Sequence, residues 1–163
     1  MMERSLAAAR TLDDPFSLAL TLYFTSVAAQ MLGDVALATT NSKLSVQMAT
    51  EHGLAQPRAW SMGVAGWCTA ENGDLKEGAA MATQAIAAMR AIHSRHFLPH
   101  LFGLLADVHL QAGHKAEAMK AVQGGLATAE ATGERFYSAE LFRLRRELLA
   151  RSPEGRKDAE ASF

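Results

Sequence analysis

Cysteine, proline and aromatic residues are scarce in this chain. The 163 residues include one cysteine, four prolines and an aromatic fraction of only 7%. A single cysteine excludes an internal disulfide and suits a reducing compartment. So few prolines leave room for long helices, because proline breaks a helix interior.

An excess of charge of one sign and long apolar runs are missing as well. The formal net charge is −1, which provides no electrostatic attraction to nucleic acid or to acidic membranes. No run approaches the roughly 18 apolar residues of a membrane-spanning helix, and the N-terminus lacks the apolar region and cleavage site of a signal peptide. We therefore expect a cytoplasmic protein with no nucleic-acid or membrane partner.

The abundant residues are strong helix formers. Hydrophobic residues make up 49% of the chain, which is enough to bury a core. They are mainly Ala, Leu and Met, whereas the β-branched residues that favour strands are fewer. The composition predicts an all-α fold.

Three glycines recur at intervals of forty residues, which is typical of a repeat protein. Aligned on Gly33, Gly73 and Gly113, the chain shows three columns of small residues. These columns hold Ser26, Gly66 and Ala106, then Ala38, Gly78 and Ala118, then Ser45, Ala85 and Gly125. Because helices approach to about 8–10 Å only where the crossing residues are small, the columns predict antiparallel helical hairpins with a glycine at each turn.

The repeat predicts where the helices and hairpins lie. The first helices of the hairpins are expected at residues 16–32, 56–72, 97–112 and 136–151, and the second helices at 34–53, 74–93 and 114–132. Gly53 and Gly133 are expected to cap second helices at their C-terminal ends. We predict one repeat domain over residues 1–163, with a half repeat at 1–14, hairpins at 15–54, 55–94 and 95–134, and a partial hairpin at 135–163.

Both ends of the chain match only part of a hairpin. Residues 3–13 fit the register of a second helix, and residues 159–163 begin another. One interpretation is that loose helices fray at both ends of the array. We expect instead that this chain is a segment of a longer protein or a shortened homologue of one.

The small-residue pattern resembles the tetratricopeptide repeat over nearly the whole chain. The period is longer than that repeat's 34 residues by about six. The aromatic residue usual late in the first helix is replaced by Ala29, Thr69 and His109. The resemblance implies an α-solenoid built from helical hairpins.

The end of the chain carries a closer resemblance. The matching segments are residues 133–137, 139–141, 143–145, 147–149, 159–161 and Phe163, together with Pro15-Phe-Ser-Leu-Ala19. They are similar to the helical-repeat C-terminal region of bacterial signalling proteins that join a class III adenylate or guanylate cyclase domain to an AAA-type ATPase domain. Arg146 departs from this pattern, which has a small residue there. The resemblance implies a regulatory or interaction module.

Nucleotide and metal sites have little support in the sequence. Neither GxxxxGK[ST] nor GxGxxG occurs, and Gly124-Gly125 is better explained by close helix packing. His93, His96 and His100 are close together, a spacing that can bind zinc. However, Pro99 interrupts them and no carboxylate is interleaved. We expect no metal and no cofactor.

Catalysis has little support either. Cys68 lies among apolar residues, where a thiol behaves as a small hydrophobe. It could meet the potential base His109 only through packing between repeats. We therefore expect a protein that is not an enzyme.

A partner is expected on the face that the first helices line in similar arrays. The predicted partner-binding residues are Tyr23, Val27, Trp60, Trp67, His100, Asp107, Arg143 and Glu147. Trp60 and Trp67 are about two turns apart on one helix face, which predicts exposed aromatic anchors of the kind that dominate interfaces. The alternative is that they fill space between hairpins.

Charged residues of both signs follow Glu134, and we expect a solvated helix face in which arginines pair with Glu140 and Glu147.

Two functions remain open. The first is a module that binds a protein, a peptide or a neighbouring domain of a longer chain. The second is an oligomerisation or spacer segment that docks through its end helices, in which case the chain forms a homo-oligomer.

Overall fold

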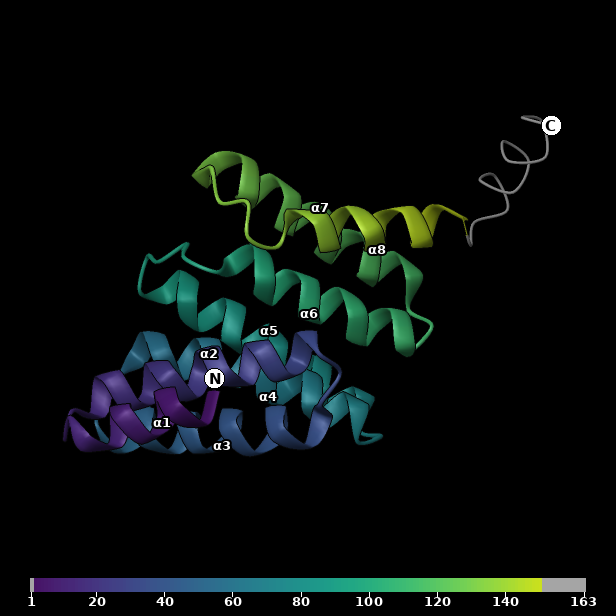
Figure 1. Ribbon diagram of the computed structural model, residues 1–163. Helices are drawn as coiled ribbons and strands as arrows, with labels where there is room; N and C mark the ends of the chain where they lie inside the picture. Colours follow the sequence, from purple (N-terminus) through teal and green to yellow (C-terminus); the bar gives the residue numbers. More distant parts are fainter. Residues whose placement is uncertain (1, 151–163) are drawn as a thin grey trace. The chain divides into compact units, whose positions relative to one another are not determined.

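The computed structural model describes residues 2–150, and over this range the chain forms helices joined by short turns (Figure 1). The described helices are α1 (Met2–Thr11), α2 (Pro15–Met31), α3 (Val35–Glu51), α4 (Ala55–Glu71), α5 (Leu75–Ala91), α6 (Leu98–Gln111), α7 (Lys115–Thr132) and α8 (Ser138–Ala150). The all-α class is confirmed, and the predicted helices are present with ends that differ by at most two residues. The helix expected from residue 159 lies outside the described residues.

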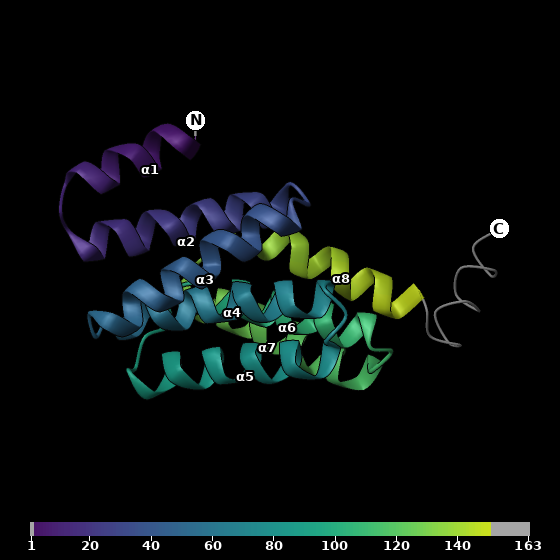
Figure 2. The same cartoon turned by 90° about the horizontal axis from the view of Figure 1, so that it is seen from below.

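The helices form two compact units that divide between Arg95 and His96. In the first unit α2 packs on α3, α4 packs on α5, α3 also packs on α4, and α2 contacts both α1 and α4. Figure 2 shows α1 at the edge of this unit, beside α2. In the second unit α6 packs on α7, and α8 contacts both.

Seven of the eight described residues with positive φ lie near helix ends at a constant spacing of twenty residues, and Phe97 is the exception. The seven are Asp13, Gly33, Gly53, Gly73, His93, Gly113 and Gly133. The left-handed backbone expected at Gly53 and Gly133 is thereby confirmed, with φ of 65° and 74°. Asp13 and His93 adopt the same backbone conformation, which costs an L-residue more than glycine.

The turn at Gly33 shows how one helix ends and the next begins. The N–H of Gly33 donates to the carbonyl of Gln30, and the N–H of Asp34 donates to that of Ala29, so the last carbonyls of α2 have partners. The Asp34 carboxylate then accepts from the N–H of Leu37 at 3.0 Å and caps α3.

Glycines at the helix crossings show why the small-residue columns are needed. A Cβ atom added to Gly66 would lie 2.8 Å from the carbonyl oxygen of Gly78. One added to Gly78 would lie 2.6 Å from that of Gly66. Consequently α4 and α5 touch backbone to backbone. At Gly125 of α7, a Cβ would lie 2.9 Å from Leu141 Cδ2 and 3.1 Å from Phe102 Cβ, which confirms that this glycine serves close packing.

Candidate functional site

Five of the eight predicted partner-binding residues lie in the interior. Trp60 and Trp67 are only 5% and 6% exposed. Tyr23, Val27 and His100 are buried as well. The expectation that the two tryptophans are exposed anchors is therefore wrong, because their rings occupy space inside the fold.

Two buried aromatic side chains of the first unit stack on each other between helices. The rings of Tyr23 on α2 and Trp60 on α4 stack with centroids 5.4 Å apart. Such pairing stabilises the contact by about 1 kcal/mol beyond the buried area. These two residues therefore hold neighbouring helices together and are not available to a partner.

His100 is buried against aromatic rings in the second unit. Its ring meets that of Tyr137 edge to face, with centroids 4.7 Å apart. Burial lowers the pKa of His100 to about 3, so the imidazole is neutral near pH 7. Gly103 makes room for this arrangement, because a Cβ there would lie 2.7 Å from Tyr137 Cδ1. His100 is a core residue.

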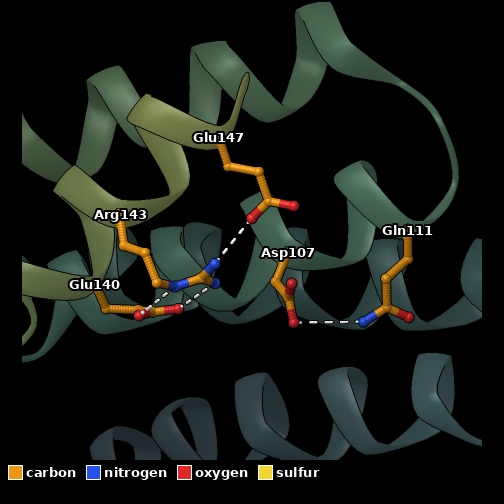
Figure 3. Close-up of polar contacts among 5 residues, drawn as sticks. All are labelled: Asp107, Gln111, Glu140, Arg143 and Glu147. Atoms are coloured by element: carbon orange, nitrogen blue, oxygen red, sulfur yellow. Dashed lines mark hydrogen bonds and ion pairs between the residues drawn. The ribbon is translucent and has the colours of Figure 1, made fainter. Parts of the chain in front are cut away.

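The other three predicted residues lie together on α6 and α8 and reach solvent. Arg143 is 47% exposed, and Glu147 is 29% exposed. Asp107 on α6 is half-buried, and α6 contacts α8 directly. Figure 3 shows these side chains with those of Gln111 and Glu140. We call these five residues the charged cluster.

Arg143 is held between two glutamates of its own helix (Figure 3). Its Nε donates to Glu140 Oε2 at 2.8 Å and one terminal nitrogen donates to Glu140 Oε1 at 2.6 Å. The other terminal nitrogen donates to Glu147 Oε2 at 2.8 Å. The hydrogen bonds to Glu140 raise the pKa of Arg143 above its ordinary value, and Glu147 adds to this effect. The predicted pairing is confirmed for Arg143.

The charged cluster contains more carboxylates than cationic groups. Gln111 donates to Asp107 Oδ2 at 3.3 Å. The five residues include the carboxylates of Asp107, Glu140 and Glu147 and a single guanidinium, that of Arg143. Partly exposed, positioned carboxylates can accept hydrogen bonds from a cationic group of a partner.

The remaining candidate groups are the histidines and Cys68. Across residues 2–150, no three side chains of His, Cys, Asp or Glu come together as a group that could hold a metal ion. Cys68 is buried, and burial raises the pKa of its thiol. Since the thiolate is the reactive form, this burial works against Cys68 as a nucleophile. None of the described helices is long and apolar enough to cross a membrane.

Sequence reasoning missed one anchoring carboxylate. Glu134, between α7 and α8, accepts a hydrogen bond from the N–H of Phe97 at 3.0 Å, next to the first residue of α6. Phe97 has a φ of 57° and no side-chain acceptor of its own. The two residues are 37 positions apart, and no local pattern could have linked them. Glu134 thus fixes the start of the helix that carries Asp107.

Comparison with known proteins adds no family to this description. No protein-family model matches the chain, and no curated protein matches it with significance.

Proposed function

We propose that the chain is a tetratricopeptide-like α-solenoid that acts as a non-catalytic interaction module. The constant spacing of left-handed residues and the close helix crossings at small-residue columns support the repeat assignment. The similarity of its last segments to cyclase–ATPase signalling proteins supports a regulatory role in a cytoplasmic signalling protein. The partner in this proposal is a protein, a peptide or a neighbouring domain.

The binding face we propose is the charged cluster. The observation that carries this choice is the geometry of Arg143, which donates hydrogen bonds of 2.6–2.8 Å to Glu140 and Glu147. Holding these long side chains in place removes part of the entropy that binding would otherwise cost. Because the cluster contains more carboxylates than cationic groups, the partner it fits presents a lysine, an arginine or a free amino terminus.

The burial of the tryptophans changes the character of this proposed interface. A groove lined by Trp60 and Trp67 would bind apolar side chains, but both rings are covered. A face built from partly exposed charges contributes mainly specificity and association rate. The interaction is therefore of modest affinity and weakened by salt.

A fluorescent peptide of a few arginines is a direct probe of this face. Binding measured by anisotropy is expected to weaken at least about threefold, or roughly 0.7 kcal/mol, in the double variant Asp107→Asn/Glu147→Gln. The matched control is Glu117→Gln/Glu130→Gln, which removes two exposed carboxylates from α7 and is expected to leave the affinity unchanged. Equal losses in both variants, or no loss in the first, would contradict the proposed face.

The second candidate function is self-association through the end helices, and a separate observation favours it. Large apolar side chains are exposed on α8, the last described helix, outside the charged cluster.

A further inference from the structure

A small apolar pocket lies in the first unit, between α1, α2 and α3. It has a volume of about 150 Å³ and is partly open to solvent. Its apolar walls are Leu18 and Leu22 of α2 and Leu44 and Met48 of α3. Leu22 is only 4% exposed, whereas Leu44 is 42% exposed, so the pocket runs from the core to the surface. A cavity of this volume accepts on the order of six carbon atoms.

Charged groups of both signs line the same pocket. Arg10 lies in the last turn of α1, and Gln47 and Glu51 lie on α3. Gln47 Nε2 donates to Glu51 Oε1 at 2.8 Å, which holds this carboxylate in place. Arg10 and Glu51 are both exposed, and within residues 2–150 no ion pair joins them. The pocket therefore offers one cation and one anion beside an apolar cavity.

The helical repeat does not require the polar side chains that α3 contributes to the pocket. Forty residues later on α5, the positions of the four α3 residues hold Gln84, Ala87, Ala88 and Ala91. On α7, the counterpart of Glu51 is again an alanine, Ala131. Small side chains thus satisfy helix packing at this position. Glu51 and its hydrogen-bond partner Gln47 are particular to the first hairpin.

In the second unit an aromatic side chain covers the corresponding place. Phe102 is the counterpart of Leu22 eighty residues later, and Gly124 is the counterpart of Leu44. A Cβ on Gly124 would lie 2.9 Å from the Phe102 ring, so the ring covers this position. In the first unit the two leucines line a cavity instead. That cavity has the size that a short hydrocarbon group of a ligand can fill.

We propose that this pocket binds a free aliphatic α-amino acid such as leucine. The aliphatic side chain enters the cavity, where burial of its apolar surface supplies affinity. The α-carboxylate pairs with the Arg10 guanidinium, and the α-ammonium group pairs with the Glu51 carboxylate. A zwitterion carries both charges next to one carbon atom, which matches a rim with one cation and one anion. The pocket belongs to the first unit, and its ligand does not depend on the proposed binding of a cationic partner by α6 and α8.

A series of matched ligands tests this assignment by methyl NMR of the full chain. Leucine is expected to shift the methyl signals of Leu22, Leu44 and Met48 with a Kd of about 1 mM. Isocaproate lacks only the ammonium group and isopentylamine lacks only the carboxylate, and each is expected to bind at least about threefold more weakly. Glycine has no side chain to fill the cavity and is expected to cause no shifts. The absence of leucine-induced shifts at these methyls, or equal binding of isocaproate or isopentylamine, would overturn the proposal.

Neutral substitutions at the rim assign each charge of the ligand to its partner. Arg10→Gln is expected to weaken leucine and isocaproate binding at least about threefold and to leave isopentylamine binding unchanged. Glu51→Gln, which still accepts from Gln47, is expected to weaken leucine and isopentylamine binding and to spare isocaproate. The controls are Arg4→Gln on α1 and Glu77→Gln on α5, which neutralise exposed residues outside the pocket. Equal losses in the controls, or the same loss for both single-charge ligands in either rim variant, would contradict the proposal.

Filling the cavity provides a test that does not depend on charge. Leu44→Trp adds a large side chain at a position that is already partly exposed, so the helical circular dichroism spectrum is expected to stay unchanged. Leucine binding is expected to weaken at least about tenfold, because the indole occupies the space of the ligand. Leu22→Phe, which copies Phe102 of the second unit, is expected to have the same effect from the inner end. Undiminished leucine binding in either folded variant would refute the pocket as the site.

Discussion

The two hairpins of the first unit share a register but are held together by different chemistry. Between α2 and α3, buried polar groups pair, with Asn41 donating to Thr25 Oγ1 at 3.1 Å and Ser45 donating to the Ala19 carbonyl at 2.7 Å. Between α4 and α5, Gly66 and Gly78 bring the two backbones into direct contact. The shared columns therefore set the size of the crossing residues and leave their polarity free.

The ends of these hairpins differ as well. Helix α3 is followed by Gly53, with φ of 65°, and α5 by His93, with φ of 54°. Glycine adopts this conformation without a Cβ penalty, and histidine does not. The repeat thus fixes the backbone conformation, while the residue that adopts it can vary.

The largest effect is expected from filling the glycine crossing. Gly78→Ala would place a Cβ 2.8 Å from that of Ala70 and closer still to the Gly66 carbonyl. Relief requires backbone movement, and such overpacking costs about 2 kcal/mol of unfolding free energy. Urea denaturation measures it. In the first hairpin the same column holds Ala38, which is fully buried, so an alanine fits at this position of the repeat. The loss of unfolding free energy in the second hairpin would therefore come from the closer approach of α4 and α5. An unchanged urea midpoint would disprove that approach.

A smaller loss is expected from breaking the polar packing of the first hairpin. Ser45→Ala removes the acceptor of the Ser61 hydroxyl, which donates to Ser45 Oγ at 2.7 Å. A buried donor left without a partner costs about 1–2 kcal/mol. The double variant Ser45→Ala/Ser61→Ala should lose less than the sum of the two single losses. Thr83→Ala, which removes an exposed hydroxyl on α5, serves as control. Strict additivity of the two serine substitutions would contradict the coupling.

The smallest effect is a gain at the end of the second hairpin. His93→Gly removes the left-handed strain and is expected to raise the unfolding free energy by about 1 kcal/mol. Thermal denaturation is a suitable measurement. Gly53→Ala should lower the stability by a similar amount at the matching position of the first hairpin, where a Cβ would meet no other atom. A loss of stability in the His93 variant would show that the imidazole makes a compensating contact.

The helices could be predicted from the sequence because the signals for them are local. The spacing of Gly33, Gly73 and Gly113 and the flanking small residues located each turn within two residues. The pairing of Arg143 with Glu140 and Glu147 was also predictable, since the three residues lie three and four positions apart on one helix. Arg145 and Arg146, expected to join them, fall on another side of α8.

The exposure of the aromatic residues could not be predicted in the same way. Whether Trp60 faces solvent or Tyr23 depends on how α4 packs on α2, which involves residues far apart in sequence. The seven-residue spacing of Trp60 and Trp67 places both rings on one face of the helix, whether that face is buried or exposed. The apolar side chains that are exposed, such as Phe16 and Phe142, were missed for the same reason.

The central claim is that the charged cluster on α6 and α8 recognises a cationic partner. Its most direct test is a two-dimensional NMR titration of the full chain with the short arginine peptide, which reports every backbone amide at once. We predict that the shifted amides concentrate around Asp107, Gln111, Arg143 and Glu147, and that Asp107→Asn/Glu147→Gln reduces these shifts at a given peptide concentration. Shifts spread evenly over exposed carboxylates on all helices, or none near these four residues, would contradict the claim.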